Sequence, residues 1–292
     1  MKKTKGIVLA GGNGTRLYPA TSGINKHLLQ VYDKPMIYYP ISTLMLSGIR
    51  DILIISSEYD LEKFSKILGN GDQFGVTFSY TVQTEPKGIA EAFIIAEEFI
   101  GEDQVCLILG DNLIYGKLNF LRDALNSNNG GYIFAYEVNN PQDFGVVTLG
   151  KDGTIIDITE KPINPQSNYA IPGIYIFDSN VVKYAKTLTP SKRNEIEITD
   201  LQKIYLSNGN LQCNIIGRGI AWLDTGTPAG LLDAGLFIHT IENRQGRKIA
   251  CLEEIAVNNE YISIDFFREI TEKLPDCKYK NYLLSIIKSK FD

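Results

Sequence analysis

A glycine-rich stretch accompanied by two positive charges lies near the start of the chain. Residues 6–19 read GIVLAGGNGTRLYP, so a short apolar run is followed by three glycines, a threonine and Arg16, and Lys26 comes ten residues after Arg16. Glycines after a strand allow backbone N–H groups to approach phosphate oxygens closely, because no Cβ stands in the way. The stretch therefore predicts a site for a phosphorylated ligand, with Arg16 and Lys26 as its cations.

Two common phosphate-binding loops do not fit this stretch. A P-loop requires G-x-x-x-x-G-K-[ST], and no such pattern follows Gly11 or Gly12. A dinucleotide-binding loop requires G-x-G-x-x-G, but counting from Gly12 places Leu17 at the last glycine position, which disfavours an NAD-linked oxidoreductase. The alternative interpretation is that the glycines form only a tight turn, with Arg16 and Lys26 exposed to solvent.

Two aspartates follow apolar runs that have the character of buried strands. Asp111 comes after VCLILG, and Asp224 comes after IAWL. A carboxylate at such a position is costly unless it lies at the ligand-facing edge and meets a cation. Mg²⁺ takes few protein carboxylates and completes its coordination with phosphate oxygens and water. The pair therefore predicts a magnesium site, and the alternative is that Asp111 caps a helix and Asp224 lies in a turn.

Short β-rich runs alternate with helical patterns through the first part of the chain. Strands are expected in residues 6–10, 51–57, 76–82 and 104–112, and helices in residues 36–48, 61–68 and 89–100. This alternation is typical of βαβ units and predicts a parallel sheet with helices on both faces. Parallel sheets bind ligands at the carboxyl ends of their strands, where the glycine-rich stretch and Asp111 are expected.

Two further regions complete the expected architecture. Residues 144–162 read FGVVTLGKDGTIIDITEKP, in which two alternating runs flank GKDG and predict a β-hairpin. Helical patterns occupy residues 228–245, 266–274 and 282–290. We expect a single α/β domain over residues 1–292: a Rossmann-like core with a mixed, mainly parallel sheet flanked by helices and a hairpin insertion (1–226), then a helical C-terminal subregion (227–292).

Composition and charge exclude several classes of protein. The 292 residues are 44% hydrophobic, which supports a sizeable packed core. The net charge of −5 provides no basic field for nucleic acid or an anionic membrane surface. The cysteines form no C-x-x-C pair and the two histidines stand alone, so neither a disulfide framework nor a zinc site is predicted. No run of residues has the length of a signal-peptide core or a membrane span, so we expect a soluble, cytoplasmic protein.

Six motifs occur in order between residues 11 and 227. They are G-G-x-G-T-R-L-x-P at residues 11–19, N-K-x-L-L and Y-D-K-P-M-I-Y-Y-P within residues 25–40, L-G-D-N at residues 109–112, E-K-P at residues 160–162, and W-L-D-T-G-T at residues 222–227. Together they resemble the sugar-1-phosphate nucleotidylyltransferases, and the resemblance is closest to the members that use dTTP and glucose 1-phosphate. It implies that dTTP and α-D-glucose 1-phosphate give dTDP-glucose and pyrophosphate with Mg²⁺. It also implies a homotetramer with feedback by a downstream dTDP-sugar.

The same resemblance implies roles for individual residues. Nucleotide binding falls to Leu9, Gly11, Gly12, Gly14, Thr15, Arg16, Lys26, Gln83, Pro86, Gly88 and Asp111. Sugar-phosphate binding falls to Leu109, Asn112, Gly145, Glu160, Lys161, Ile171, Tyr175 and Arg193. The catalytic set is Arg16, Lys26, Asp111, Lys161 and Asp224, of which Asp111 and Asp224 are the expected magnesium ligands.

Four positions depart from the family pattern. His27 stands where glutamine is frequent, Gln30 where proline is usual, Lys87 where aspartate is frequent and Pro172 where threonine is frequent. The phosphate and metal residues are complete, so these departures bear on the preference for nucleotide and sugar rather than on catalysis.

Alternatives remain at the level of substrate and of class. One methyl group separates thymine from uracil, and a methyl in an apolar pocket discriminates by only about 1–3 kcal/mol. A uridylyltransferase, or an enzyme for another hexose 1-phosphate, is therefore the alternative within the class. The alternative of another class is an inactive protein that senses nucleotide sugars. Such a protein would be expected to lack a metal aspartate or a phosphate lysine, and this chain has all of them.

Overall fold

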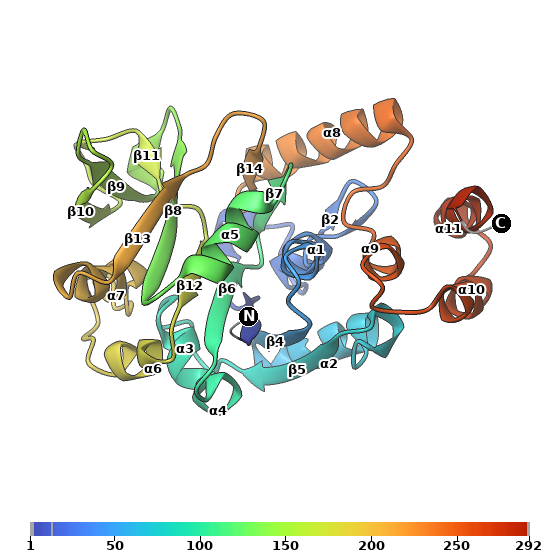
Figure 1. Ribbon diagram of the computed structural model, residues 1–292, viewed down its shortest axis with the longest axis horizontal. Helices are drawn as coiled ribbons and strands as arrows, with labels where there is room; N and C mark the ends of the chain where they lie inside the picture. Colours follow the sequence, from blue (N-terminus) through green and yellow to red (C-terminus); the bar gives the residue numbers. More distant parts are fainter. Residues whose placement is uncertain (1–2, 13, 291–292) are drawn as a thin grey trace.

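The computed structural model describes residues 3–12 and 14–290, apart from the side chain of residue 290 (Figure 1). The strands of its main sheet are β1 (Thr4–Leu9), β4 (Asp51–Ser56), β5 (Thr77–Val82), β6 (Gln104–Leu109), β8 (Gly131–Glu137), β9 (Gly145–Leu149), β10 (Ile155–Glu160), β11 (Tyr169–Ala170), β12 (Ile174–Phe177) and β13 (Leu211–Ile215). In the described residues they follow the order β10-β9-β11-β8-β12-β6-β1-β4-β5, and β13 pairs with β8.

One half of this sheet is parallel and the other half is mixed. Strands β5, β4, β1 and β6 run parallel to one another, whereas β12 is antiparallel to both β6 and β8. The hairpin expected in residues 144–162 is formed by β9 and β10, with Gly145 opposite Glu160. The predicted α/β class with a mixed sheet and a hairpin insertion is confirmed, and the antiparallel region extends beyond the hairpin.

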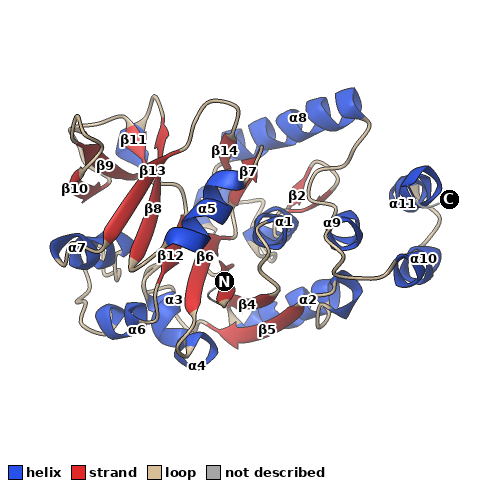
Figure 2. Cartoon of the chain, viewed as in Figure 1, coloured by secondary structure: helices blue, strands red, loops and turns tan. Residues whose placement is uncertain are grey.

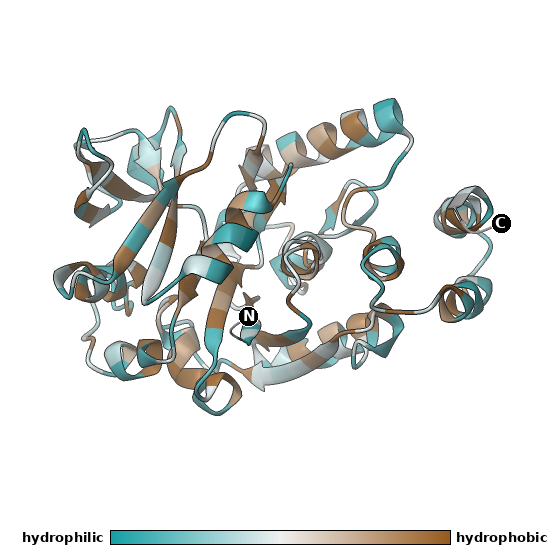
Figure 3. Cartoon of the chain, in the orientation of Figure 1, coloured by the Kyte–Doolittle hydropathy of each residue, from teal (hydrophilic) through white to brown (hydrophobic). Residues whose placement is uncertain are grey.

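Helices cover both faces of the sheet. They are α1 (Tyr38–Leu46), α2 (Glu58–Leu68), α3 (Glu91–Ile95), α4 (Glu97–Ile100), α5 (Asn119–Ser127), α6 (Asn180–Ala185), α7 (Ile198–Ser207), α8 (Pro228–Gln245), α9 (Leu252–Asn258), α10 (Ile264–Glu272) and α11 (Lys278–Lys290). Helices α1, α2, α5 and α9 pack on the face that contains Val8, and α3, α4, α6 and α7 pack on the face that contains Ile7. The central strands β1, β4 and β6 are therefore largely buried on both sides, and Figure 3 shows the hydrophobic residues along β6.

A small second sheet brings distant segments together. Strand β7 (Asn112–Tyr115) pairs antiparallel with β14 (Ala221–Asp224), and Asn112 lies opposite Asp224. The N–H and the hydroxyl of Thr225 both donate to the carbonyl oxygen of Asp111, at 3.0 and 2.7 Å. Asp111 and Asp224 are therefore neighbours, although more than a hundred residues separate them in the sequence.

Helix α8 packs against the hairpin formed by β2 (Gln30–Val31) and β3 (Lys34–Pro35). Lys34 is buried, and its ammonium group bonds Asp33 and Glu242, the latter at 3.3 Å. Lys248 bonds the same two carboxylates. The segment that follows Lys26 is thereby attached to the end of α8.

The C-terminal helices α10 and α11 lie beyond α9, as Figure 2 shows. They share a small apolar core with α9 that includes Val257, Phe267 and Leu283. The predicted helices in residues 228–245, 266–274 and 282–290 are confirmed, whereas α9 was not expected. None of the helices in the described parts of the chain combines the length and apolar character that a bilayer span requires.

Candidate active site

A cavity of about 340 Å³ opens at the carboxyl ends of β1 and β6. Every predicted site residue lines it except Gly14 and Thr15. Gly14 has a φ of 58° and precedes a 3₁₀ turn over Thr15–Leu17, so these two residues form the bend of the loop rather than the cavity wall. Asn13 of the same motif lies outside the described residues.

Asn25 fixes the turn that carries Lys26. Its side-chain oxygen accepts a hydrogen bond from the N–H of His27 at 2.9 Å, and its side-chain nitrogen donates to the carbonyl of Ala10 at 3.1 Å and to Asp60 at 2.9 Å. Asn25 is itself buried. The turn is therefore attached to the end of β1 and to α2, and Lys26 has a defined position beside the glycine-rich loop.

A buried ion pair joins Lys26 to Asp111. Lys26 Nζ lies 2.6 Å from Asp111 Oδ2, and the two side chains are only 16% and 8% exposed. Burial by itself would raise the pKa of Asp111, but the charge and hydrogen bond of Lys26, with the hydrogen bond from Asn112, outweigh this effect and hold the pKa far below its usual range. Asp111 is therefore ionised.

Asp224 lies on the same wall of the cavity, but its pKa is shifted in the opposite direction from that of Asp111. Burial and the negative charge of Asp111 raise its pKa, while Arg16 Nη1 lies 4.0 Å from Asp224 Oδ2 and offsets part of this effect. The N–H of Gly226 donates to Asp224 Oδ1 at 2.9 Å. Two carboxylates that repel each other in a cavity form a donor set suited to a divalent cation.

A magnesium ion here would use few protein ligands. Among residues 3–12 and 14–290 there is no group of three or more histidine, cysteine, aspartate and glutamate side chains that could hold a metal. Asp111 and Asp224 fit Mg²⁺, which keeps several waters and binds substrate phosphates alongside one or two carboxylates.

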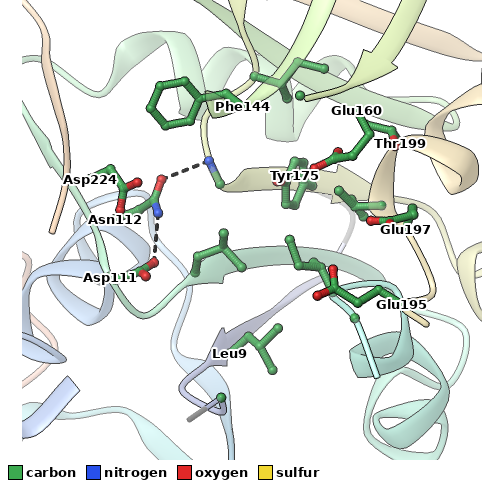
Figure 4. A pocket seen from close by; sticks show the side chains of 18 of the residues that line it. Leu9, Asp111, Asn112, Phe144, Glu160, Tyr175, Glu195, Glu197, Thr199 and Asp224 are labelled. Carbon is green, nitrogen blue, oxygen red and sulfur yellow. Dashed lines mark hydrogen bonds between the residues drawn. The ribbon is translucent and has the colours of Figure 1, made fainter. Parts of the chain in front are cut away.

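Asn112 connects several parts of the site. Its Nδ2 donates to Asp111 Oδ1 at 3.1 Å, and its Oδ1 accepts from the N–H of Gly173 at 2.9 Å and from Trp222 Nε1 at 2.6 Å. Figure 4 shows the first two of these contacts beside Asp224. Asn112 therefore orients the carboxylate of Asp111.

Arg193 lies among glutamates at the other end of the cavity. Its Nε and Nη2 donate to the two oxygens of Glu197 at 3.0 and 2.7 Å, and Nη2 also donates to Glu160 at 3.2 Å. Burial raises the pKa of Glu160 although Arg193 opposes this shift. Glu197 holds the guanidinium by two bonds and thus fixes its plane.

The end of the hairpin positions Lys161. This residue follows β10 with a left-handed φ of 41°, and its N–H donates to the carbonyl of Phe144 at 3.0 Å. The turn brings Lys161 to the cavity wall beside Glu160 and Gly145.

Close neighbours explain two of the glycines that were predicted to bind the nucleotide. A Cβ on Gly11 would lie 2.3 Å from Gln83 Oε1, and a Cβ on Gly88 would lie 2.4 Å from the carbonyl oxygen of Ile196. Gln83 Nε2 donates to Glu91 at 2.8 Å, which fixes the direction of its amide. Gln83 therefore presents a fixed amide to the cavity.

Comparison with known proteins identifies the family. A family model described as Nucleotidyl transferase matches residues 5–241. The chain is 50% identical over 286 residues to the glucose-1-phosphate thymidylyltransferase of Neisseria meningitidis, covering 97% of this chain and 99% of that protein. The enzyme of the same name from Mycobacterium tuberculosis is 48% identical over 284 residues, with the same two coverages. The chain belongs to the glucose-1-phosphate thymidylyltransferases of the nucleotidyl transferase family.

Solved structures support this family assignment. A Bacillus anthracis protein named as a candidate glucose-1-phosphate thymidylyltransferase, in complex with a sucrose, has a TM-score of 0.75 and 41% identity, covering 80% of this chain and 94% of that one. A UDP-glucose pyrophosphorylase complexed with UDP-glucose has a TM-score of 0.72 and 25% identity, covering 82% of this chain and all of that one.

Several cavity residues of this thymidylyltransferase family member were not predicted as ligands. They are His27, Ile89, Asp143, Phe144, Gly173, Glu195, Glu197, Ile198, Thr199, Gln202 and Trp222. Thr199 and Gln202 belong to α7, a helix that was not predicted from the sequence, so no sequence signal pointed to these two buried polar residues. His27 had been noted only as a departure from the family pattern. Burial, with help from Lys26, lowers its pKa to about 3, so this imidazole is neutral.

Proposed function

We propose that this nucleotidyl transferase transfers a thymidylyl group from dTTP to α-D-glucose 1-phosphate, giving dTDP-glucose and pyrophosphate. The observation that carries the proposal is that the expected nucleotide residues, apart from Gly14 and Thr15, and the expected sugar-phosphate residues line one cavity, with the pair of Lys26 and Asp111 in its wall. The names of relatives at about half identity support the same activity.

The chemistry is a direct displacement. A phosphate oxygen of the sugar phosphate forms a bond to the α-phosphorus of the nucleotide, the bond from that phosphorus to the bridging oxygen breaks, and pyrophosphate leaves. The attacking phosphate is already anionic, so neither a protein nucleophile nor a general base is required. The task of the protein is to place two polyanions together and to stabilise the charge that develops between them.

The cations of the cavity divide this task. Lys26 and Arg16 bind the nucleotide phosphates and the leaving pyrophosphate, whereas Lys161 and Arg193 bind the sugar phosphate. Arg193 makes its glutamate contacts through Nε and Nη2, and its Nη1 can donate to a phosphate oxygen.

The acceptor and amide groups of the cavity select the substrates. Glu160 can accept hydrogen bonds from two sugar hydroxyls, and the Gln83 amide matches the N3–H and carbonyl edge of a pyrimidine. Asp111 and Asp224 would hold Mg²⁺, which supplies positive charge against the phosphate oxygens when it is bound. The family resemblance supports a cytoplasmic homotetramer with feedback by a dTDP-sugar, and light scattering with and without dTDP-sugars tests the assembly.

A pyrophosphate-release assay tests the activity. Four nucleoside triphosphates are crossed with several hexose 1-phosphates in the presence of Mg²⁺, and kcat/KM is measured for each pair. We expect the highest value for dTTP with glucose 1-phosphate. A preference for UTP would support the uridylyltransferase alternative. No pyrophosphate with any pair would refute the enzymatic function.

A further inference from the structure

Gln202 of α7 is a buried side chain without an internal partner. Its exposed fraction is 0%, and in the described residues neither its Oε1 nor its Nε2 has a hydrogen-bond partner. A buried amide left in this state costs free energy that native proteins nearly always avoid. Gln202 also lines the cavity of the active site. A ligand in that cavity can therefore satisfy the amide that the protein itself does not.

The position of Gln202 assigns it to the sugar end of the cavity. Ile198, Thr199 and Gln202 follow one another at helical spacing and all line the cavity. Helix α7 packs against β10, the strand that ends in Glu160. A Cβ on Gly145 would lie 3.2 Å from the methyl of Thr199 and 3.4 Å from Glu160 Oε2, so Thr199 and Glu160 approach the same point.

We propose that Gln202 is a specificity-determining residue whose side-chain amide hydrogen-bonds a hydroxyl group of the hexose. The proposal rests on the proposed function and adds a residue to its sugar site. An amide has both a donor and an acceptor, and a hydroxyl can engage both. Glu160 in its ionised form only accepts, so the two side chains have complementary requirements toward a polyhydroxylated ring.

The unpaired amide also predicts an unusual balance between stability and activity. In the free protein an apolar side chain at this position would remove an uncompensated polar group, so stability should not fall. In the complex with sugar phosphate the same change would leave a substrate hydroxyl unpaired. A site built to bond a hydroxyl discriminates strongly against ligands that lack it. A buried water bonded to Gln202 is the competing explanation, and it predicts a loss of stability with no preference among sugars.

The test uses two variants and a matched control in the full-length protein. Gln202→Leu and Gln202→Met remove the amide and retain a similar volume. Gln104→Leu is the control, because Gln104 is also buried, at 5% exposure, but bonded: its Nε2 donates to Thr4 and to the carbonyl of Leu125, both at 2.9 Å. The measurements are urea unfolding and the kcat/KM of glucose 1-phosphate and its 2-, 3-, 4- and 6-deoxy analogues at saturating dTTP.

For both Gln202 variants we expect unfolding free energies equal to or above wild type, and a lower value for Gln104→Leu. The kcat/KM for glucose 1-phosphate should fall roughly 5- to 100-fold, with the KM for dTTP unchanged. For the deoxy analogue that lacks the hydroxyl bonded by Gln202, wild type and variant should have equal kcat/KM, because neither protein can form that hydrogen bond. A uniform loss over all analogues, no loss for glucose 1-phosphate, or a fall in stability would overturn the role of Gln202. A wild-type protein inactive with every hexose 1-phosphate would instead overturn the proposed function and this inference with it.

Discussion

Replacing Lys26 by methionine isolates the charge of the buried ion pair. The side chain keeps a similar length and apolar stem, but Asp111 loses the ammonium that lies 2.6 Å away. Asp111 is 8% exposed and also lies close enough to Asp224 for each charge to disfavour the other. Removing one partner of a buried pair typically costs about 3–5 kcal/mol. We expect a loss of about 3 kcal/mol at neutral pH, the lower end of this range, because the cavity admits solvent.

The loss should depend on pH in a defined direction. In wild type the pKa of Asp111 in the folded state is lowered below the ordinary 3.8, so its contribution to stability is present above that value and is lost as pH falls toward the folded pKa. In the variant the ammonium of Lys26 no longer offsets the effect of burial, so the folded pKa of Asp111 is higher than in wild type. Protonation then relieves the penalty as pH falls. The difference in stability between the two proteins should therefore shrink from neutral pH toward pH 3.8.

Urea unfolding at several pH values, in EDTA and without nucleotide, measures this difference. Lys66→Met is the control, since Lys66 and Glu62 also lie 2.6 Å apart but are 73% and 76% exposed. Water screens such a pair, and its loss should have little effect. If Lys26→Met and Lys66→Met changed stability equally, or if the effect of Lys26→Met did not vary with pH, the proposed electrostatic role of the buried pair would be wrong.

Two further substitutions test the assigned roles. Lys161→Ala and Lys26→Ala should each lower turnover roughly 100-fold or more. Calorimetric titration with dTTP alone should show weaker binding only for Lys26→Ala. A greater loss of dTTP affinity in Lys161→Ala would reverse the two roles. Asp224→Asn keeps the shape of a magnesium ligand and removes its charge, so turnover should fall roughly 100-fold or more at saturating Mg²⁺, and a near-normal rate would remove Asp224 from the proposed metal site.

Local sequence patterns were sufficient to predict the site residues that lie at the ends of strands. Leu9 ends β1 and Gly11 lies two residues beyond it, and Leu109 ends β6 with Asp111 two residues beyond it. The two strands are parallel neighbours with Leu9 opposite Leu109, so their ends meet at one edge. The placement of both groups at the cavity could be predicted because parallel pairing forces it.

Local sequence patterns could not predict which distant strands pair with each other. Nothing in the periodicity of residues 221–224 indicates that β14 pairs with β7 and sets Asp224 beside Asp111. The two aspartates could be paired from the sequence only by their shared chemistry, as carboxylates that follow apolar runs, and by the family resemblance. The helix expected over residues 89–100 is interrupted at Ala96, where α3 ends and α4 begins, a break that helix propensity alone did not predict.

The charges of the site explain how an acidic protein can bind two polyanions. The chain carries a net charge of −5, yet Arg16, Lys26, Lys161 and Arg193 all line one cavity. Carboxylates pair with three of these cations, as Lys26 with Asp111, Arg193 with Glu197 and, at longer range, Arg16 with Asp224. The pairs spare the free protein an uncompensated buried charge and hold the cations in place before the substrates arrive. Donors fixed in advance need little reorganisation as charge develops on the phosphates, and for this reaction such preorganisation is the main contribution that the protein can make.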